Sequence, residues 1–592
     1  MGGIKSIMST VDDRTQKQLE EDIRLLKGIR SRGQIPLITE RPPENAPPLA
    51  NVQGDVLHRF PKSYERFLFF RIKDPTLFRV ALKNFKPTSS QDVKDTILQI
   101  AKVKDEAKRA EKPADRVKLK QYLIGFSRTG LYVLNIQGKT GDERFDKYCM
   151  RDNRVFLGDQ GRWDKLFDKS NYNEKEGSVH DIENPDALHG VIAIATDNKE
   201  DCDEATEDVK KIFGESWAIP DDGIVDGNVR PDPIRHHEHF GYKDGISQPA
   251  VRGIEYPLPG QIQVDPGVIV MGYDGDPVPN RPEWCKDGTM MVFRKLEQSV
   301  LLFDKYTNDN GPRWKEFFPG GKEAADRLNP PLTNAEGAEL FGARFVGRWK
   351  SGAPLPLAPI RDDRELGDDP KRNNNFDYTV RDVAGVSSLT PSDYYCPFTA
   401  HSRKTVPRNL DPYISRRYLE SGAIVRAAIP YGPEVTDEER QAWKPPPAES
   451  NEKKRGLLFN CYASHLDSGF VRQTTGYGNN DFFPITGLTP VKHGQDPIIG
   501  GPPPTDSSGE ERGASLEKKP THVFKTGDQV DIKLQVPGDT LNRYRVNGHI
   551  EVQPLTQVDP PGADNPFFVT SRGGEYFFVP SIPTLKSWAS SQ

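Results

Sequence analysis

The stretch ERFLFFRIKDPTLFRVALKNF, residues 65–85, contains a complete strand-to-helix unit. Its first eight residues are rich in the aromatic and aliphatic side chains that favour β-strands, and the segment PTLFRVALKNF that follows has helical periodicity. Similar patterns predict strands in QYLIGFSRTGLYVL (121–134) and HGVIAIATD (189–197), with a helix in DKYCMRDNRVFLGD (146–159) between them. Strands and helices therefore alternate in this part of the chain.

A second series of apolar runs of strand length follows further along the chain. These runs are GVIVMGY (267–273), GTMMVFRKLEQSV (288–300), AIVRAAIPYGP (423–433) and KRGLLFNCYA (454–463). The sequence thus predicts an α+β protein with two similar halves, 46–235 and 236–592, after a polar extension at 1–45 in which residues 16–30 can form an amphipathic helix. The interval near 494–565 begins with many Gly, Pro, Ser and charged residues, so we expect a mobile insertion there.

Composition limits the classes of function. Of the 592 residues, 35% are hydrophobic and 28% are charged, which is typical of a globular protein and not of an integral membrane protein. The net charge is −5 and no basic stripe stands out, so nucleic acid is not expected as a partner. The five cysteines are widely separated and form no CxxC pair, which disfavours a disulfide framework or a zinc site. The sequence does not indicate an oligomeric state.

The first residues, MGGIKSIMSTVDDRTQKQ, contain no apolar core of the kind found in secretory signals. We therefore expect an intracellular protein, in the cytoplasm. The same residues fit the N-myristoylation pattern at Gly2.

The segment HFGYKDGISQP, residues 239–249, sets Asp244 between Gly241 and Gly245. Asp–Gly is a common turn dipeptide, so a plain surface turn is one interpretation. The other is a ligand pocket, because the two glycines permit unusual backbone conformations and the close approach of a bulky partner.

Two further segments carry groups able to do chemistry. CPFTAHSRKTVPRN places His401 before several cations, and SGAIVRAAIPYGPE places Arg426 in an apolar strand. Taken singly, these are a structural histidine and a structural salt bridge. Taken together with Asp244, they supply an axial imidazole for a heme iron, a base for a peroxide proton and a cation for the charge that develops as the O–O bond breaks.

In its sequence motifs the chain resembles the dye-decolorizing heme peroxidases, and most closely the longer fungal type. The resemblance extends from about residue 50 to 585. It rests on these motifs in this order: NVQGDVL (51–57), IGFSRTGL (124–131), GYKDGIS (241–247), GTMMVFRKLEQ (288–298), RFVGRWKSGAP (344–354), NNFDY (374–378), CPFTAHSRKTVPR (396–408), IVRAAIPYGPE (424–434), RGLLFNCYAS (455–464) and SRGGEYFFVPSIPTL (571–585).

The resemblance implies two ferredoxin-like halves, each an antiparallel sheet with helices, and heme b held between the sheet and helices of the C-terminal half. It implies His401 as the iron ligand, Asp244 as the acid-base residue and Arg426 as its partner. The implied activity is reduction of H₂O₂ and oxidation of organic donors, such as dyes and phenolic or other aromatic compounds, through a ferryl intermediate.

Finer assignments follow from the same resemblance. Arg403 and Arg348 are candidate partners of the heme propionates. A carboxylate usually orients a ligating imidazole through its other nitrogen, and Asp467 is the candidate for that role. One departure is Gly476–Gly478, which stands where the family has a tryptophan-bearing segment. The alternatives to a peroxidase are a heme carrier or sensor with little turnover and a structural protein without heme.

Overall fold

The computed structural model describes residues 45–159, 163–168, 186–381, 392–408, 414–444, 452–480, 495–500 and 568–590, together with a few short pieces between them. It also gives the backbone of three strands, β1 (Leu37–Ile38), β14 (Gln529–Gln535) and β15 (Arg545–Glu551). The predicted myristoylation pattern at Gly2 and the predicted helix at 16–30 lie outside the described residues.

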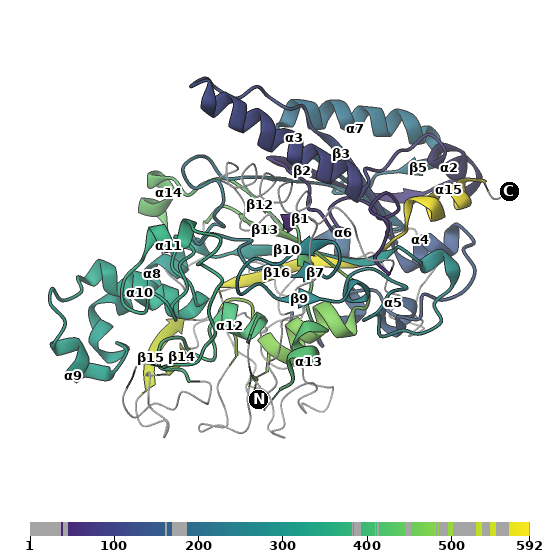
Figure 1. Ribbon diagram of the computed structural model, residues 1–592. Coiled ribbons are helices and arrows are strands. Elements are labelled where there is room, and N and C mark those ends of the chain that lie inside the picture. Colours follow the sequence, from purple (N-terminus) through teal and green to yellow (C-terminus); the bar gives the residue numbers. More distant parts are fainter. Residues whose placement is uncertain are drawn as a thin grey trace, which may run out of the picture.

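A long, mainly antiparallel sheet runs through the molecule in the order β11-β13-β10-β16-β3-β4-β2-β5, with β12 beside β13 and β6 beside β2 (Figure 1). The first half of the chain supplies β2 (Tyr64–Ile72), β3 (Lys120–Phe126), β4 (Gly190–Thr196), β5 (Trp217–Ala218) and β6 (Ile224–Asn228). The second half supplies β10 (Thr289–Gln298), β11 (Val425–Arg426), β12 (Ile429–Tyr431), β13 (Gly456–Ala463) and β16 (Val569–Val579).

The two sets of strands meet at one edge, where Phe578 of β16 is the register partner of Phe126 of β3. Within each set all pairings are antiparallel. The predicted α+β class with antiparallel sheets is confirmed. The sequence patterns did not show that the two sheets join edge to edge, because an edge contact between distant strands leaves no local periodicity.

Helices α2 (Pro75–Leu82), α3 (Ser90–Arg109) and α7 (Lys199–Phe213) cover one face of the first set of strands (Figure 1). Smaller helices α4 (Arg128–Val133), α5 (Glu143–Lys147) and α6 (Lys165–Asp168) follow the loops between strands. Both long helices have strong N-terminal caps: the Ser89 hydroxyl accepts from Asp92 N and forms a capping box, and the Asn198 side chain accepts from Asp201 N. The predicted strand-to-helix alternation is confirmed for residues 64–82.

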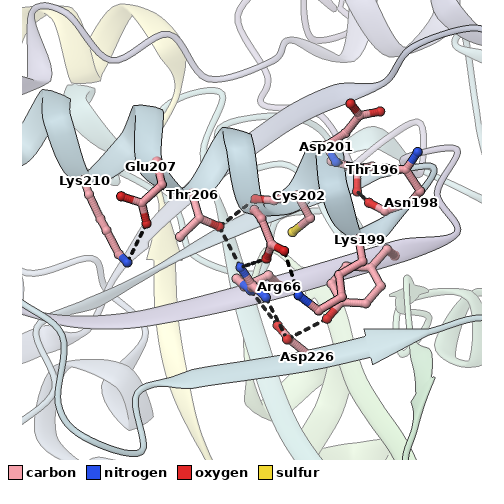
Figure 2. A network of polar contacts seen from close by, with 12 residues as sticks. Arg66, Thr196, Asn198, Lys199, Asp201, Cys202, Thr206, Glu207, Lys210 and Asp226 are labelled. Carbon is pink, nitrogen blue, oxygen red and sulfur yellow. Dashed lines mark hydrogen bonds and ion pairs between the residues drawn. The ribbon is translucent and has the colours of Figure 1, made fainter.

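A polar network fixes α7 on the sheet, as Figure 2 shows. Arg66 of β2 donates to Asp226 of β6 at 2.7 Å and to Asp203 and Thr206 of α7 at 2.8 and 3.1 Å. The Arg66 side chain is only 9% exposed, so these partners supply the charge and hydrogen bonds that a buried guanidinium requires. The network therefore stabilises the helix layer of the first half, and β6, which carries Asp226, lies in contact with β12 of the second half.

The second half carries a separate group of helices, which gather at one end of the molecule and beneath the sheet (Figure 1). They are α8 (Val300–Asn310), α9 (Gly321–Asp326), α10 (Asn334–Val346), α11 (Arg364–Asp368), α12 (His401–Thr405), α13 (Arg416–Glu420) and α14 (Asp437–Ala442). The last helix, α15 (Ile582–Ser590), returns to the first half, where Arg79 of α2 donates to the Trp588 carbonyl at 2.7 Å.

Three local predictions are wrong. The run at 121–134 was predicted as strand, but β3 ends at Phe126 and residues 128–133 form α4. Residues 267–273 form no strand: a 3-10 turn at Pro266–Val268 leads into further turns, although the run is buried. Residues 146–159 contain only the end of α5 and a 3-10 turn at Arg151–Asn153 in place of the predicted helix. The run at 267–273 is apolar and largely buried, and burial alone does not distinguish a strand from a packed turn.

The insertion predicted near 494–565 begins too early. Residues 495–500 are packed, with Asp496 and Ile498 buried, and β14 pairs with β15 in an antiparallel hairpin further along. The other residues of this interval lie outside the described part of the chain. The domain boundary predicted at residue 235 falls between β6 and β7 (Ala250–Val251), and it stays a prediction. In the described ranges no helix combines the length and apolar character needed to cross a bilayer.

Candidate active site

A cavity of about 290 Å³ lies against one face of the second half of the sheet. Strands β10, β13 and β16 each line it with residues two positions apart, which project from the same face of a strand. These residues are Arg294, Leu296, Gln298, Leu457, Phe459, Val569 and Ser571. Helix α12, the loop at 238–249 and the π-helical segment Asp467–Gly478 close the cavity on its other sides.

Asp244 lies in the loop that precedes β7, and it borders the cavity. Gly241 and Gly245 have φ angles of 93° and 76°, which residues with side chains rarely adopt. The Glu238 carboxylate accepts hydrogen bonds from the backbone N–H groups at positions 240 and 242, both at 2.8 Å. The loop is therefore held rigidly, and the glycine-flanked aspartate belongs to a cavity wall and not to a plain surface turn.

Arg426 of β11 forms an ion pair with Asp244. Its Nη1 donates to Asp244 Oδ1 at 3.0 Å and its Nη2 donates to the Ser247 carbonyl at 3.1 Å. The Gln248 side chain accepts from the backbone N–H of Arg426 at 3.0 Å and donates to its carbonyl at 2.9 Å. The guanidinium is thus fixed against the loop that carries the carboxylate.

The ion pair also sets the protonation of Asp244. Burial alone would raise the pKa of this carboxyl, but the charge of Arg426 and the N–H of Gly245 outweigh burial and hold the pKa below its ordinary value. The Asp244 side chain keeps 32% of its surface exposed because it faces the cavity. The site therefore presents an ionised carboxylate and a cation, even in mild acid.

His401 begins α12 and lines the same cavity. Its Nδ1 lies 2.7 Å from Oδ2 of Asp496, whose side chain is completely buried. The other oxygen of Asp496 accepts from the N–H groups of Ile498 and Ile499 at 2.8 and 3.2 Å. Burial lowers the pKa of His401, but the Asp496 carboxylate outweighs burial and the pKa is raised. Nδ1 is committed to this carboxylate, which leaves Nε2 as the nitrogen available to a ligand.

The predicted role of Asp467 is therefore wrong. Asp467 forms an ion pair with Arg144, and its side chain is 43% exposed, whereas Asp496 is the carboxylate at His401. Asp496 was missed because its segment, GQDPIIGG, has the composition of an insertion. The available signal was a short apolar pair, Ile498–Ile499, which follows Asp496 and Pro497 in a polar interval.

The propionate contact predicted for Arg403 stays a prediction. Arg403 is fully buried beside the cavity wall but does not line the cavity. Its guanidinium lies 4.1 Å from the centre of the Phe398 ring and 4.5 Å from that of Tyr378, and it donates to backbone carbonyls. This arginine stabilises the segment that leads into α12.

The predicted Arg348 borders the cavity, and Arg408 borders it as well. Arg348 donates to the carbonyls of Gly352 and Asn373 at 2.9 and 2.7 Å and to the Asn374 side chain at 2.9 Å. Burial, followed by the charge of Arg408, lowers the pKa of Arg348 to about 9. Burial also lowers the pKa of Arg408, whose Nε has no hydrogen-bond partner among the described residues. Two neighbouring cations at one rim, one buried and one half-buried, suit an anionic ligand group.

Comparisons with known proteins agree with this geometry. A family model for the DyP dimeric alpha+beta barrel domain matches residues 51–231. A dye-decolorizing peroxidase of Exidia glandulosa is 35% identical over 538 residues, which cover 90% of this chain and 86% of that protein. The chain belongs to the dye-decolorizing peroxidase family. A second member, from Auricularia auricula-judae, is 33% identical with the same coverage, and an ancestral D-type dye-decolorizing peroxidase of known structure superposes with a TM-score of 0.69 at 35% identity, covering 92% of this chain and all of that one.

Dye-decolorizing peroxidases are heme enzymes, and the cavity fits a heme. Its walls contain apolar strand residues. Among the described lining residues His401 is the histidine, and its Nε2 makes no contact with Asp496. The Nε of Arg408, which has no hydrogen-bond partner among the described residues, lies at the rim. The segment Gly476–Gly478 stands where the family has a tryptophan-bearing segment. Its Tyr477 lines the cavity and stacks on Phe483, with ring centroids 3.9 Å apart. An aromatic wall is therefore present without the tryptophan.

Proposed function

We propose that this protein is a heme peroxidase that reduces H₂O₂ and oxidises organic electron donors, including dyes and phenolic compounds. The observation that carries the proposal is the Asp244–Arg426 ion pair, 3.0 Å long, in the same cavity as His401. Cleavage of a peroxide needs a group that moves its proton and a fixed cation that stabilises the departing oxygen, and the pair supplies both. Membership of the dye-decolorizing peroxidase family supports the same activity.

The proposed cofactor is heme b, with His401 as the axial ligand through Nε2. Arg348 and Arg408 are the proposed partners of the propionates, because both guanidinium groups border the cavity; Arg348 is buried and Arg408 half-buried. Asp496 keeps the proton of His401 on Nδ1 and so fixes the tautomer that can bind a metal. When bound, the heme supplies the redox chemistry of the reaction.

The side chains have distinct proposed roles. Asp244 accepts a proton from one peroxide oxygen and delivers it to the other, while Arg426 stabilises the negative charge that develops on the departing oxygen. The ion pair keeps Asp244 deprotonated before peroxide arrives. Gln248 holds the backbone of Arg426 on both sides, so the cation does not need to reorganise during the step.

A phenolic donor is the first substrate class to test. A dye-decolorizing peroxidase that is 34% identical to this chain, with a TM-score of 0.66 over 92% of it, has been solved in complex with 2,6-dimethoxyphenol. We propose the same class of donor here.

The decisive experiment measures heme binding and turnover in the same preparation. Wild-type protein should show a Soret band and oxidise 2,6-dimethoxyphenol with H₂O₂, and His401→Ala should lose the band and the activity. His465→Ala is the control, because His465 is half-buried but does not line the cavity. Heme bound without turnover would favour a carrier or sensor, and absence of heme from wild-type protein would refute both functions.

A further inference from the structure

The segment that carries Asp244 folds as a small hairpin, residues 236–244, ahead of β7. Backbone contacts join its two arms. The N–H of Asp244 donates to the His236 carbonyl at 3.0 Å, and the N–H of Glu238 donates to the Tyr242 carbonyl at 3.0 Å. Asp244 is the last residue of one arm, so the direction of its side chain depends on how the turn at the other end of the hairpin is held.

The Glu238 side chain holds that turn. Its carboxyl group accepts from the N–H groups of Phe240 and Tyr242, both at 2.8 Å, and from the side-chain amide of Gln298. Gln298 is the last residue of β10, so the third contact ties the turn to the sheet. Glu238 therefore fixes both the shape of the turn and its place against β10.

The same turn is tied to the strands next to Arg426. Nε2 of His239 donates to the carbonyl of Tyr431, the last residue of β12, at 2.9 Å. Arg230 donates to the carbonyl that precedes His239, at 2.5 Å, and to both carboxylate oxygens of Glu434, at 2.9 and 2.6 Å. Because β12 follows β11, which contains Arg426, these contacts join the hairpin to the segment that carries the cation.

The protonation of Asp244 records its position. Burial raises the pKa of this carboxyl, whereas the charge of Arg426 and the N–H of Gly245 lower it and outweigh burial. Both of these contacts depend on where the hairpin places the carboxylate. A loosened turn would weaken them, and the pKa of Asp244 would then rise.

We propose that Glu238 is a positioning residue for the reaction with peroxide. Its carboxyl group sets the place of Asp244 against Arg426 by holding the turn of the hairpin, and it does not itself move the peroxide proton. The inference rests on the proposed peroxidase function, because it concerns the step that the ion pair assists.

Stopped-flow mixing of heme-loaded, full-chain variants with H₂O₂ from pH 3 to 7 tests this role. Glu238→Ala removes the acceptor and should slow the reaction about 10- to 100-fold, because a misplacement of about 1 Å in a reacting group can cost as much. The acid limit of the rate should also move to higher pH. Glu238→Gln keeps one acceptor oxygen and should recover part of the rate. The Soret band and the heme affinity should stay at their wild-type values in both variants.

The direction of the pH shift separates displacement from a simple loss of charge. A neighbouring carboxyl can only raise the pKa of Asp244, so removing Glu238 without displacement would leave the acid limit in place or move it to lower pH. Arg59 and His401 also act on Asp244 through their charges, and both remain in every variant. Glu452→Ala is the matched control. The Glu452 carboxylate also accepts two backbone N–H groups, those that begin α8, at 2.8 and 3.2 Å, but it does not line the cavity, so this variant should keep the wild-type rate and acid limit.

A wild-type rate and acid limit in a folded Glu238→Ala protein would overturn the proposal. Loss of heme with an unchanged acid limit would also overturn it, because Glu238 would then be only structural. If Glu238→Ala does not fold, Glu238→Gln decides: a slower reaction with heme bound supports the proposal, and the wild-type rate refutes it.

Failure of the proposed function gives a different result, because wild-type protein would then not react with peroxide at all. Amide hydrogen exchange in the heme-loaded protein tests the hairpin in that case. Faster exchange at Phe240 and Tyr242 in Glu238→Ala than in wild type would support the holding role of Glu238, and equal exchange would refute it.

Discussion

Replacing Asp496 by asparagine should weaken heme binding more than replacing it by alanine. One carboxylate oxygen of Asp496 accepts two backbone N–H groups, at 2.8 and 3.2 Å, and the other lies 2.7 Å from Nδ1 of His401. In the variant the amide oxygen remains with the two N–H donors, so the amide NH₂ group faces Nδ1. Nδ1 must then accept a hydrogen bond, which moves the ring proton to Nε2 and blocks the nitrogen proposed to bind iron.

The expected size of the effect follows from these contacts. Loss of an outer partner of a metal-binding histidine typically costs about 10- to 100-fold in affinity, and we expect this loss for Asp496→Ala. In Asp496→Asn, the productive tautomer additionally leaves a buried N–H without an acceptor, at a cost of about 1–3 kcal/mol, or roughly 5- to 150-fold. The two variants should therefore rank below wild type in the order alanine, then asparagine.

Heme titration followed at the Soret band measures this ranking, and the reduction potential of the bound heme gives an independent readout. The potential should rise in both variants, because a histidine without its carboxylate partner is a weaker electron donor to iron. Asp467→Asn is the matched control, since Asp467 pairs with Arg144 and does not contact His401. Wild-type heme affinity and potential in a folded Asp496→Asn protein would refute the role assigned to Asp496.

Three further predictions concern the ion pairs. Asp244→Asn should slow the reaction with peroxide about 10²–10⁴-fold in stopped-flow measurements; because the pKa of Asp244 lies below its ordinary 3.8, the wild-type rate should persist at pH 4, and a loss of rate already at pH 5 would contradict this. Arg426→Gln should retain heme but slow the same reaction about 10²–10³-fold; it should also move the acid limit of the rate to higher pH, because Asp244 loses the cation that lowers its pKa, and loss of heme instead would make Arg426 structural. Arg455→Met should lower the free energy of unfolding by about 3–5 kcal/mol in urea titrations, because the side chains of Arg455 and Glu439 are 0% and 4% exposed and 2.6 Å apart. Arg313→Met, at the exposed pair with Glu316, is the control. An equally small cost for both variants would show that the buried pair is dispensable.

The sequence determined the elements whose signals are local. The β2 and β4 strands, the α2 helix and the β10 and β13 strands follow from apolar periodicity within a single window of residues. The glycines around Asp244 also carry a local signal, because a positive φ is a property of one residue. The buried run at 267–273 was misjudged because its composition reports burial, whereas its turns are imposed by the surrounding structure.

Only the tertiary structure decided which distant groups meet. Asp244 and Arg426 are 182 residues apart in the chain, and His401 and Asp496 are 95 apart. Asp467 and Asp496 are both aspartates that follow β13, and no local pattern shows which one folds back onto α12. Arg59 reaches the Asp244 loop from the first half of the chain, 186 residues before Gly245, where its Nη1 lies 3.3 Å from the position of a Cβ on Gly245. Contacts of this kind depend on the packing of whole layers, and a sequence window records only the residues that are neighbours along the chain.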